Sequence, residues 1–304
     1  MIAPIPGTIE EIQNRIEVDK ILEECWKNPD AGYEVQPSDE WIVNNQQQQE
    51  DGYYFDILEG DNIIDEAITM VPRKPSTYGE ITSLGARQLF GAMGLLEYPR
   101  NQPRQQNQQR RRPVHFFDLG SGTGKLVGQA VLELPNDVIQ LATGVELSPS
   151  RHESAVQAKE YLQRLLVTND RSEYGYRRNN NIEVSLSQAM IDRSSSDKLE
   201  LLRGDLFDVD LSTATHIYIA SLCFPDKLML RLEQKLQILM QQQLEQDEEI
   251  VLQWVASLQP FPNNLGGIRP IVRFMEMSWT KPFGCAVHLY RCRTRISNKD
   301  NTKE

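Results

Sequence analysis

Residues Phe116 to Lys125, which read F-F-D-L-G-S-G-T-G-K, decide the fold class of this chain. An apolar run ends in Asp118, and Gly120, Gly122 and Gly124 then alternate with small residues before a helix-like segment. A strand, a tight glycine turn and a helix in this order are typical of a nucleotide-type cofactor site. Glycine lets the backbone approach a ligand closely, and the start of a helix offers N–H groups to an anion. We therefore predict a cofactor-binding α/β domain.

The spacing of the glycines discriminates between cofactors. The dinucleotide fingerprint requires G-x-G-x-x-G, in which the third glycine lets the helix pack closely. Here the spacing is G-x-G-x-G, and the next position is Lys125. A phosphate loop requires Gly-Lys followed by Ser or Thr, but Leu126 follows here. A nicotinamide dinucleotide is thus a distant alternative, and a phosphate loop is disfavoured.

A second apolar run, I-Q-L-A-T-G-V-E at Ile139 to Glu146, ends in an acid. Glu146 follows the glycine turn at about the 20-residue spacing of an acid that binds a ribose. A carboxylate at this place can accept hydrogen bonds from both ribose hydroxyls. The alternative is a structural charge at the start of a helix near Pro149.

Strands and helices alternate along the chain and then give way to strands alone. The expected strands are 114–119, 139–146, 199–203, 216–220, 250–258, 271–280 and 286–292, and the expected helices are 9–26, 125–134, 149–167 and 226–246. The last helix carries an apolar stripe of Leu228, Leu232, Leu236 and Leu239. This order predicts a doubly wound, mainly parallel α/β sheet with an antiparallel C-terminal edge.

Ligands of such a sheet bind at the carboxyl ends of the strands. Besides Asp118, Gly120 and Glu146, we expect Asp205 and Leu206 there, to hydrogen-bond an adenine amino group and pack its ring. For Asp205 the alternative is a turn-forming residue. The segment that begins at Ser221 follows the next strand and is predicted to lie near the reacting group. Within it, Cys223 is expected to be a small buried residue rather than a nucleophile.

The net charge of −11 is unevenly distributed. Residues 1–75 hold 17 acidic and 5 basic side chains, so the remainder is close to neutral. The dense basic run is 100–112, with five arginines among Gln, Asn and Pro and no aromatic residue for base stacking. It is interpreted as a polar insertion, or else as an electrostatic tether to DNA, to an acidic protein surface or to residues 1–75.

The four cysteines and the apolar runs indicate the cellular environment of the protein. Cys25, Cys223, Cys285 and Cys292 form no C-x-x-C pair, so no zinc or other metal site and no disulfide framework is predicted. No apolar run approaches the ~20 residues of a membrane span, and the N-terminus lacks the pattern of a secretory signal. An intracellular protein without a membrane role is therefore expected. The four histidines are scattered and are interpreted as ordinary fold residues.

The glycine turn behind Asp118 resembles motif I of the class I S-adenosylmethionine methyltransferases. That resemblance implies a Rossmann-like, seven-stranded sheet and S-adenosyl-L-methionine as the cofactor. It also implies that Gly120, Gly122 and Gly124 pack against the methionine part of the cofactor, and that Asp118 orients its amino-acid end.

Further motifs are similar to one subfamily. They are T-Y-G-E-I at Thr77–Ile81, G-V-E-L-S at Gly144–Ser148 with Arg151, G-D-L-F at Gly204–Phe207, and S-W-T at Ser278–Thr280 before Lys281-Pro282. Over residues 76–293 the chain resembles the disruptor-of-telomeric-silencing family of non-SET histone lysine methyltransferases. The resemblance implies a loop with Tyr78 and Glu80 that closes over the cofactor, and it makes Tyr78, Ser221 and Trp279 candidates for positioning the reactants and lining a lysine channel.

The resemblance implies a chromatin regulator of the nucleus that binds histones or nucleosomes. The chain departs from the nucleosomal members at Ala220-Ser221, where they carry paired Asn, and at Lys125, where they usually carry Gln. A methyltransferase of a non-histone protein, RNA or a small metabolite is therefore one alternative, with a cytoplasmic location. A cofactor-binding scaffold without catalysis is another.

The predicted organisation has three parts. Residues 1–75 form an acidic N-terminal region of mixed helix and short strands, 76–295 form the methyltransferase domain, and 296–304 form a tail. Polar insertions are expected at 100–112 and 168–196 within the domain.

Overall fold

The computed structural model describes residues 8–28, 32, 80–96, 113–170, 196–245, 252–280 and 283–292. The strands are β1 (Val114–Leu119), β2 (Ile139–Glu146), β3 (Leu199–Arg203), β4 (His216–Ile219), β5 (Trp254–Ser257), β6 (Ile271–Met275) and β7 (Cys285–Arg291). The helices are α1 (Ile9–Cys25), α5 (Ser83–Ala92), α6 (Lys125–Glu133), α7 (Pro149–Asp170), α9 (Asp226–Glu245) and the short α10 (Asn264–Gly267), with 3-10 turns η4 (Ser196–Lys198) and η5 (Ser221–Cys223).

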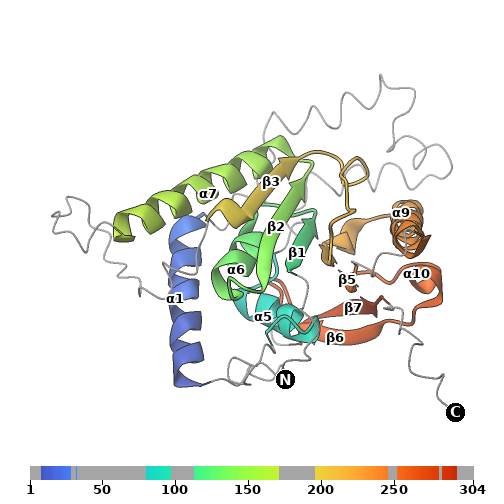
Figure 1. Cartoon of the computed structure of the whole chain (residues 1–304), viewed down its shortest axis with the longest axis horizontal. Coiled ribbons are helices and arrows are strands. Elements are labelled where there is room, and N and C mark those ends of the chain that lie inside the picture. Colours follow the sequence, from blue (N-terminus) through green and yellow to red (C-terminus); the bar gives the residue numbers. More distant parts are fainter. Residues whose placement is uncertain are drawn as a thin grey trace, which may run out of the picture.

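The strands form one seven-stranded sheet in the order β3-β2-β1-β4-β5-β7-β6 (Figure 1). The first five are mutually parallel, whereas β7 runs antiparallel to both β5 and β6. This confirms the predicted fold: a doubly wound, mainly parallel α/β sheet with an antiparallel C-terminal edge, the sheet implied by the class I methyltransferase resemblance. The chain winds outward from β1 in both directions, so the switch point lies between β1 and β4, where such sheets bind ligands.

Two hydrophobic clusters cover the two faces of the sheet. One combines buried side chains of α1, α5, α6 and α7 with Phe116 and Ala142, and the other combines those of α9 with Phe117 and Ile217. Adjacent residues of β1 thus point to opposite faces, as the period of a strand requires. The predicted leucine stripe of α9 is buried in the second cluster.

Helix α1 belongs to the same core as the sheet. A capping box at Thr8 and Glu11 starts the helix. Its residues Val18, Ile21 and Leu22 are fully buried in the core cluster, and the helix packs against α6 and α7. The N-terminal helix therefore packs on the cofactor-domain core, while the boundary predicted at residue 75 lies outside the described residues and stays a prediction.

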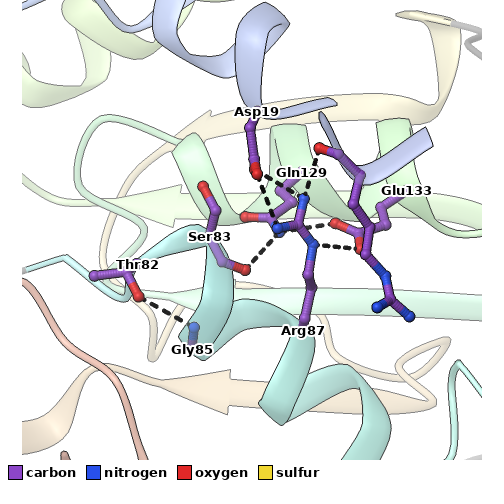
Figure 2. A network of polar contacts seen from close by, with 8 residues as sticks. Asp19, Thr82, Ser83, Gly85, Arg87, Gln129 and Glu133 are labelled. Atoms are coloured by element: carbon purple, nitrogen blue, oxygen red, sulfur yellow. Dashed lines mark hydrogen bonds and ion pairs between the residues drawn. The ribbon is translucent and has the colours of Figure 1, made fainter. Parts of the chain in front are cut away.

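Polar contacts join α1 to that core at Arg87 of α5 (Figure 2). Its Nε donates to Glu133 Oε1 of α6 at 2.7 Å, and its terminal nitrogens donate to both oxygens of Asp19 at 2.8 and 3.0 Å. Gln129 donates to the second oxygen of Glu133 and to the carbonyl of Ser83. Three helices are thereby connected through one buried guanidinium group.

The predicted elements differ from the observed ones in identifiable ways. Helix α5 was not predicted, because Gly85 and Gly91 weaken its helical pattern. Gly85 is required there, since a Cβ atom would lie 2.0 Å from the carbonyl oxygen of Glu276. The strand predicted over 271–280 ends at Met275, and Met277 instead forms an isolated bridge with Ile81.

Other predictions were wrong only in their ends, or lie outside the described residues. Helix α7 extends to Asp170 beyond the predicted 167, and β4 ends one residue early at Ile219. The short strands of the N-terminal region, Tyr78, the insertion 100–112, most of 168–196 and the tail 296–304 all lie outside the described residues.

Candidate functional site

The site lies where β1 and β2 end and the chain turns toward α6. Gly120, Gly122 and Gly124 have φ angles of 83°, 55° and 78°, which are left-handed and favour glycine. Gly124 caps α6 without a side-chain hydrogen bond. The turn also crosses closely over β2, because a Cβ atom on Gly144 would lie 2.8 Å from Ser121 Oγ. Local sequence and close packing thus explain the alternating glycines.

Glu146 is the last residue of β2, and its side chain holds the glycine turn in place. Its Oε2 accepts a hydrogen bond from the backbone N–H of Gly122 at 2.7 Å, and its Oε1 accepts from the N–H of Ser148 at 2.7 Å. The side chain is buried. Each carboxylate oxygen has a second lone pair, so Glu146 can accept two further hydrogen bonds from a ligand diol while holding the loop.

Asp118 is the acid of the site whose surroundings most disfavour its charged form. It is buried, and its Oδ1 accepts no hydrogen bond within the described part of the chain. Burial, together with the nearby charges of Glu146 and Glu80, raises the pKa of Asp118 well above its ordinary value. A buried acceptor without a donor implies a missing partner, and a cationic ligand group would both supply the donor and lower this pKa.

Glu80 comes from a segment that precedes the turn by 40 residues and yet contacts it. Its Oε1 accepts a hydrogen bond from Thr123 Oγ1 at 2.6 Å. Its backbone exchanges two bonds with Ser278: Ser278 N donates to Glu80 O at 2.9 Å, and Glu80 N donates to Ser278 Oγ at 3.2 Å. The two motifs that characterise the subfamily resemblance, around residues 80 and 278, are therefore neighbours at the glycine turn.

Trp279 follows directly in this segment and is 39% exposed. The tight turn that carries it is closed by Thr280, whose N–H donates to Met277 O at 3.2 Å and whose hydroxyl accepts from Met277 N at 3.1 Å. A large aromatic side chain thus stands partly in solvent beside the Glu80 segment, while Tyr78 lies outside the described residues.

Asp205 follows the end of β3, as predicted, and adopts the turn-forming geometry that was its alternative interpretation. Its Oδ1 accepts from Phe207 N at 2.9 Å, and burial raises the pKa of its carboxyl. Lys235 of α9 then holds the loop by donating to the carbonyls of Leu206, Phe207 and Val209 at 3.2, 2.6 and 2.7 Å. Both roles are compatible, because Asp205 Oδ2 remains available for a ligand within the described contacts.

The segment after β4 corrects one prediction. Cys223 is exposed rather than buried, because η5 turns it away from the sheet. Ser221, in contrast, is fully buried, and its Oγ accepts from Gln259 N at 3.0 Å. Its hydroxyl therefore ties the end of β4 to the end of β5. Phe224 packs against the cluster under α9.

Several contributing residues were missed by sequence reasoning. Thr123 was treated as a spacer between glycines, although its hydroxyl reaches Glu80. Trp26 donates from its indole Nε1 to the carbonyl of Thr123 at 2.7 Å, across 97 residues of sequence. Gly32 was missed as well: its carbonyl accepts a hydrogen bond at 2.9 Å from Nε of Arg151, which had been named with the G-V-E-L-S motif. Of these residues, only Thr123 could have been identified from the sequence, because its hydroxyl lies inside the glycine turn. Nothing in the sequence around Trp26 or Gly32 indicates a contact with the site.

No group of three or more His, Cys, Asp or Glu side chains among the described residues is arranged to hold a metal ion. Among the helices described, none is both long and apolar enough to cross a membrane.

His115 bridges Thr143 and Thr213, and His216 bonds Thr215, so these two histidines serve the fold as predicted.

No protein-family model matches the chain, and no curated protein matches it. Solved structures that resemble it include an RNA methyltransferase from Salinibacter ruber with S-adenosyl-L-homocysteine, at 19% identity over 59% of this chain and 80% of that one, with a TM-score of 0.32. Magnesium protoporphyrin IX methyltransferase from Synechocystis with bound SAM is 11% identical over 85% and 99%, with a TM-score of 0.37. A human methyltransferase 10 domain containing protein is 8% identical over 69% and 83%, with a TM-score of 0.38.

At these identities and TM-scores the likenesses carry no argument about the acceptor. The cofactor predicted from the glycine turn, S-adenosylmethionine, is the one bound, as such or as its demethylated product, in the Synechocystis and Salinibacter structures. The structures named above are all methyltransferases, and this chain has the α/β architecture implied by its resemblance to the class I methyltransferases.

Proposed function

We propose that this chain is an S-adenosylmethionine-dependent methyltransferase whose acceptor is a protein lysine, with a core histone in nucleosomes as the substrate. The observation that carries the cofactor assignment is the buried Oδ1 of Asp118, which has no hydrogen-bond partner among the described residues and lies beside a turn of three left-handed glycines. An α-ammonium group satisfies that oxygen with charge as well as with a hydrogen bond.

Three acids each bind a different part of the cofactor. Asp118 accepts from the amino group, Glu146 accepts from the ribose hydroxyls, and Asp205 accepts from the adenine amino group, with Leu206 packing the ring. Glu146 is suited to its role because the Gly122 and Ser148 N–H groups already hold its carboxylate in one orientation. When bound, the cofactor supplies a methyl group activated by a sulfonium centre.

The remaining chemistry is alignment and desolvation of an amine. A lysine must be neutral to attack, and an apolar, aromatic surrounding lowers the pKa of its amine. Trp279 is a candidate for one wall of that channel, since its segment is bonded to Glu80, and Tyr78 for another. Ser221 contributes indirectly, because it holds the ends of β4 and β5 together through Gln259. The lysine acceptor rests on the subfamily resemblance of these segments.

The first test is transfer of labelled methyl from the cofactor into nucleosomes, free histones, RNA and a cell lysate. We expect label in a core histone of nucleosomes. Label in RNA or a small metabolite without label in histone would overturn the acceptor and leave the enzyme class standing. Absence of cofactor binding by calorimetry would overturn the whole proposal.

The second test probes the ribose contact with Glu146→Ala. We expect cofactor affinity to fall by roughly 2–3 kcal/mol, because hydrogen bonds to a charged acceptor are lost. Glu153→Ala is the matched control, since Glu153 is an exposed acid of α7, and it should bind as the wild type does. Unchanged affinity in Glu146→Ala would refute the ribose contact.

A third test separates acceptor from cofactor. Trp279→Ala should lower kcat/KM for the protein acceptor while leaving the cofactor Kd unchanged. Phe283→Ala, a nearby aromatic residue that is 79% exposed, provides the control and should leave both constants unchanged. Equal activity of wild type and Trp279→Ala on histone would remove Trp279 from the channel.

A further inference from the structure

Trp26, the C-cap residue of α1, reaches the glycine turn from the N-terminal helix. Its indole Nε1 donates to Thr123 O at 2.7 Å. Thr123 is bonded a second time through its hydroxyl, which donates to Glu80 Oε1 at 2.6 Å. The residue between Gly122 and Gly124 is thus held through its backbone from one side and through its side chain from another.

The indole ring occupies space that a side chain on α6 would otherwise fill. A Cβ atom on Gly128 would lie 2.3 Å from Trp26 Cη2 and 2.9 Å from Cζ2. Gly128 lies one turn after Gly124, and its N–H donates to Gly124 O at 3.0 Å. This glycine is helical and needs no left-handed φ, so its lack of a side chain is explained by the ring that packs on it.

The position of Trp26 is fixed by the rest of α1. Arg87, which is 6% exposed, binds Asp19 of α1 and Glu133 of α6 at once. Figure 2 shows this guanidinium between carboxylates from two helices. A terminal nitrogen of Arg87 also donates to Arg15 O at 3.1 Å. Because α1 is anchored on α6, the indole meets the turn in one orientation.

We propose that Trp26 is a positioning residue of the cofactor site. Its bond to the Thr123 carbonyl fixes the orientation of the Thr123–Gly124 peptide, and with it the turn whose Gly122 N–H is bonded to Glu146. A turn that is already ordered loses less conformational entropy when a ligand binds. This inference rests on the proposed function, and it assigns the N-terminal helix to the cofactor site.

The primary test is Trp26→Phe, which removes the N–H donor and keeps an aromatic ring. We expect the cofactor Kd and the KM for the cofactor to rise about three- to tenfold, the effect of losing one hydrogen bond. We expect kcat at saturating cofactor to change less than twofold. Val18→Ala is the control: Val18 is a fully buried residue of α1, so its loss should lower Tm without changing the cofactor Kd.

A coupling test uses Gly128. In the wild type, Gly128→Ala should displace the indole and weaken cofactor binding as Trp26→Phe does. In a Trp26→Ala background the space is vacant, so Gly128→Ala should weaken binding no further. Additive losses in the double variant would contradict the proposed contact.

The outcomes separate this inference from the proposed function. Wild-type protein that binds cofactor, with Trp26→Phe equal to it within twofold, overturns the role of Trp26 alone. A Val18→Ala variant that loses affinity in proportion to its loss of Tm also overturns it, because the effect is then general destabilisation. Wild-type protein that binds no cofactor overturns both.

Discussion

At the scale of single residues, the site is organised by acids in unequal surroundings. Glu146 has two backbone donors. Asp118, in contrast, is buried with one oxygen that has no partner in the described part of the chain, and it lies within electrostatic reach of Glu146 and Glu80. An acid that is costly to ionise in the absence of a ligand is suited to bind a cation, since the ligand relieves the repulsion. We therefore expect the titration of Asp118 to report cofactor binding.

Cofactor binding should release a proton from Asp118. Its pKa is raised in the ligand-free protein, and an ammonium group lowers it, so affinity should increase as pH rises through the raised pKa. Calorimetry in two buffers of different ionisation enthalpy, over a series from about pH 5 to about pH 8, measures the release. Asp118→Asn should abolish it, while Asp137→Asn, which changes an exposed acid in the turn before β2, should not. Identical heats in both buffers throughout would contradict this assignment.

At the scale of elements, three helices are joined by the ion pairs of Arg87. Burial raises the pKa of Glu133 in spite of the adjacent guanidinium, which lowers it. The Glu133 carboxylate is thus stabilised by Arg87 against a large cost of desolvation. Such a group contributes little net stability when paired but becomes costly when its partner is removed, so the network specifies how α1, α5 and α6 fit together.

Arg87→Met should lower the free energy of unfolding by about 3–5 kcal/mol, because Glu133 is left buried without its partner. Removal of Arg87 raises the pKa of Glu133 further. The native state then binds a proton more readily than the unfolded state, so the loss should be smaller at lower pH. Urea denaturation at two pH values measures both effects.

Arg164→Met is the control for this prediction, because Arg164 is an exposed arginine of α7. Its effect should stay within about 0.5 kcal/mol. Arg87→Met with Glu133→Leu should recover part of the loss, since no uncompensated buried charge remains. A double variant as unstable as Arg87→Met alone would show that packing, and not charge, dominates.

At the scale of the whole molecule, one continuous sheet connects the central strands β1 and β4, whose ends form the candidate site, to the antiparallel C-terminal edge. His216 lies in β4 at its centre and is 2% exposed. Burial lowers the pKa of His216 to about 4, although a hydrogen bond with the Met93 backbone opposes this. The protonation state of this side chain is therefore linked to folding of the entire sheet.

Acidification should destabilise the fold through His216. Its pKa is lower in the folded than in the unfolded state, so between about pH 6.5 and about pH 4 the unfolded chain binds the extra proton. Stability should fall toward acid with a slope of up to about 1.4 kcal/mol per pH unit from this residue. His216→Gln should flatten the dependence of Tm on pH, whereas parallel curves for the two proteins would exclude His216 as the cause.

The local sequence determined much of this protein. The tight turn has left-handed φ angles at Gly120, Gly122 and Gly124, which glycine adopts readily, and the apolar runs before it and before Glu146 indicate strands. These patterns depend on neighbours in the chain, so the order of the strands could be predicted from them. The cofactor contacts of Asp118, Glu146 and Asp205 stay predictions. The leucine stripe of α9 was predicted on the same basis.

Only the tertiary structure decided which distant residues complete the site. Trp26 bonds Thr123, Glu80 bonds Ser278, and Lys235 holds the loop after Asp205. Each contact depends on how helices and loops pack on the sheet, and no local pattern encodes it. The same reason explains why α5 was missed and why Cys223 proved exposed: burial and close approach are properties of the packed chain, whereas turns and strand ends are properties of its local sequence.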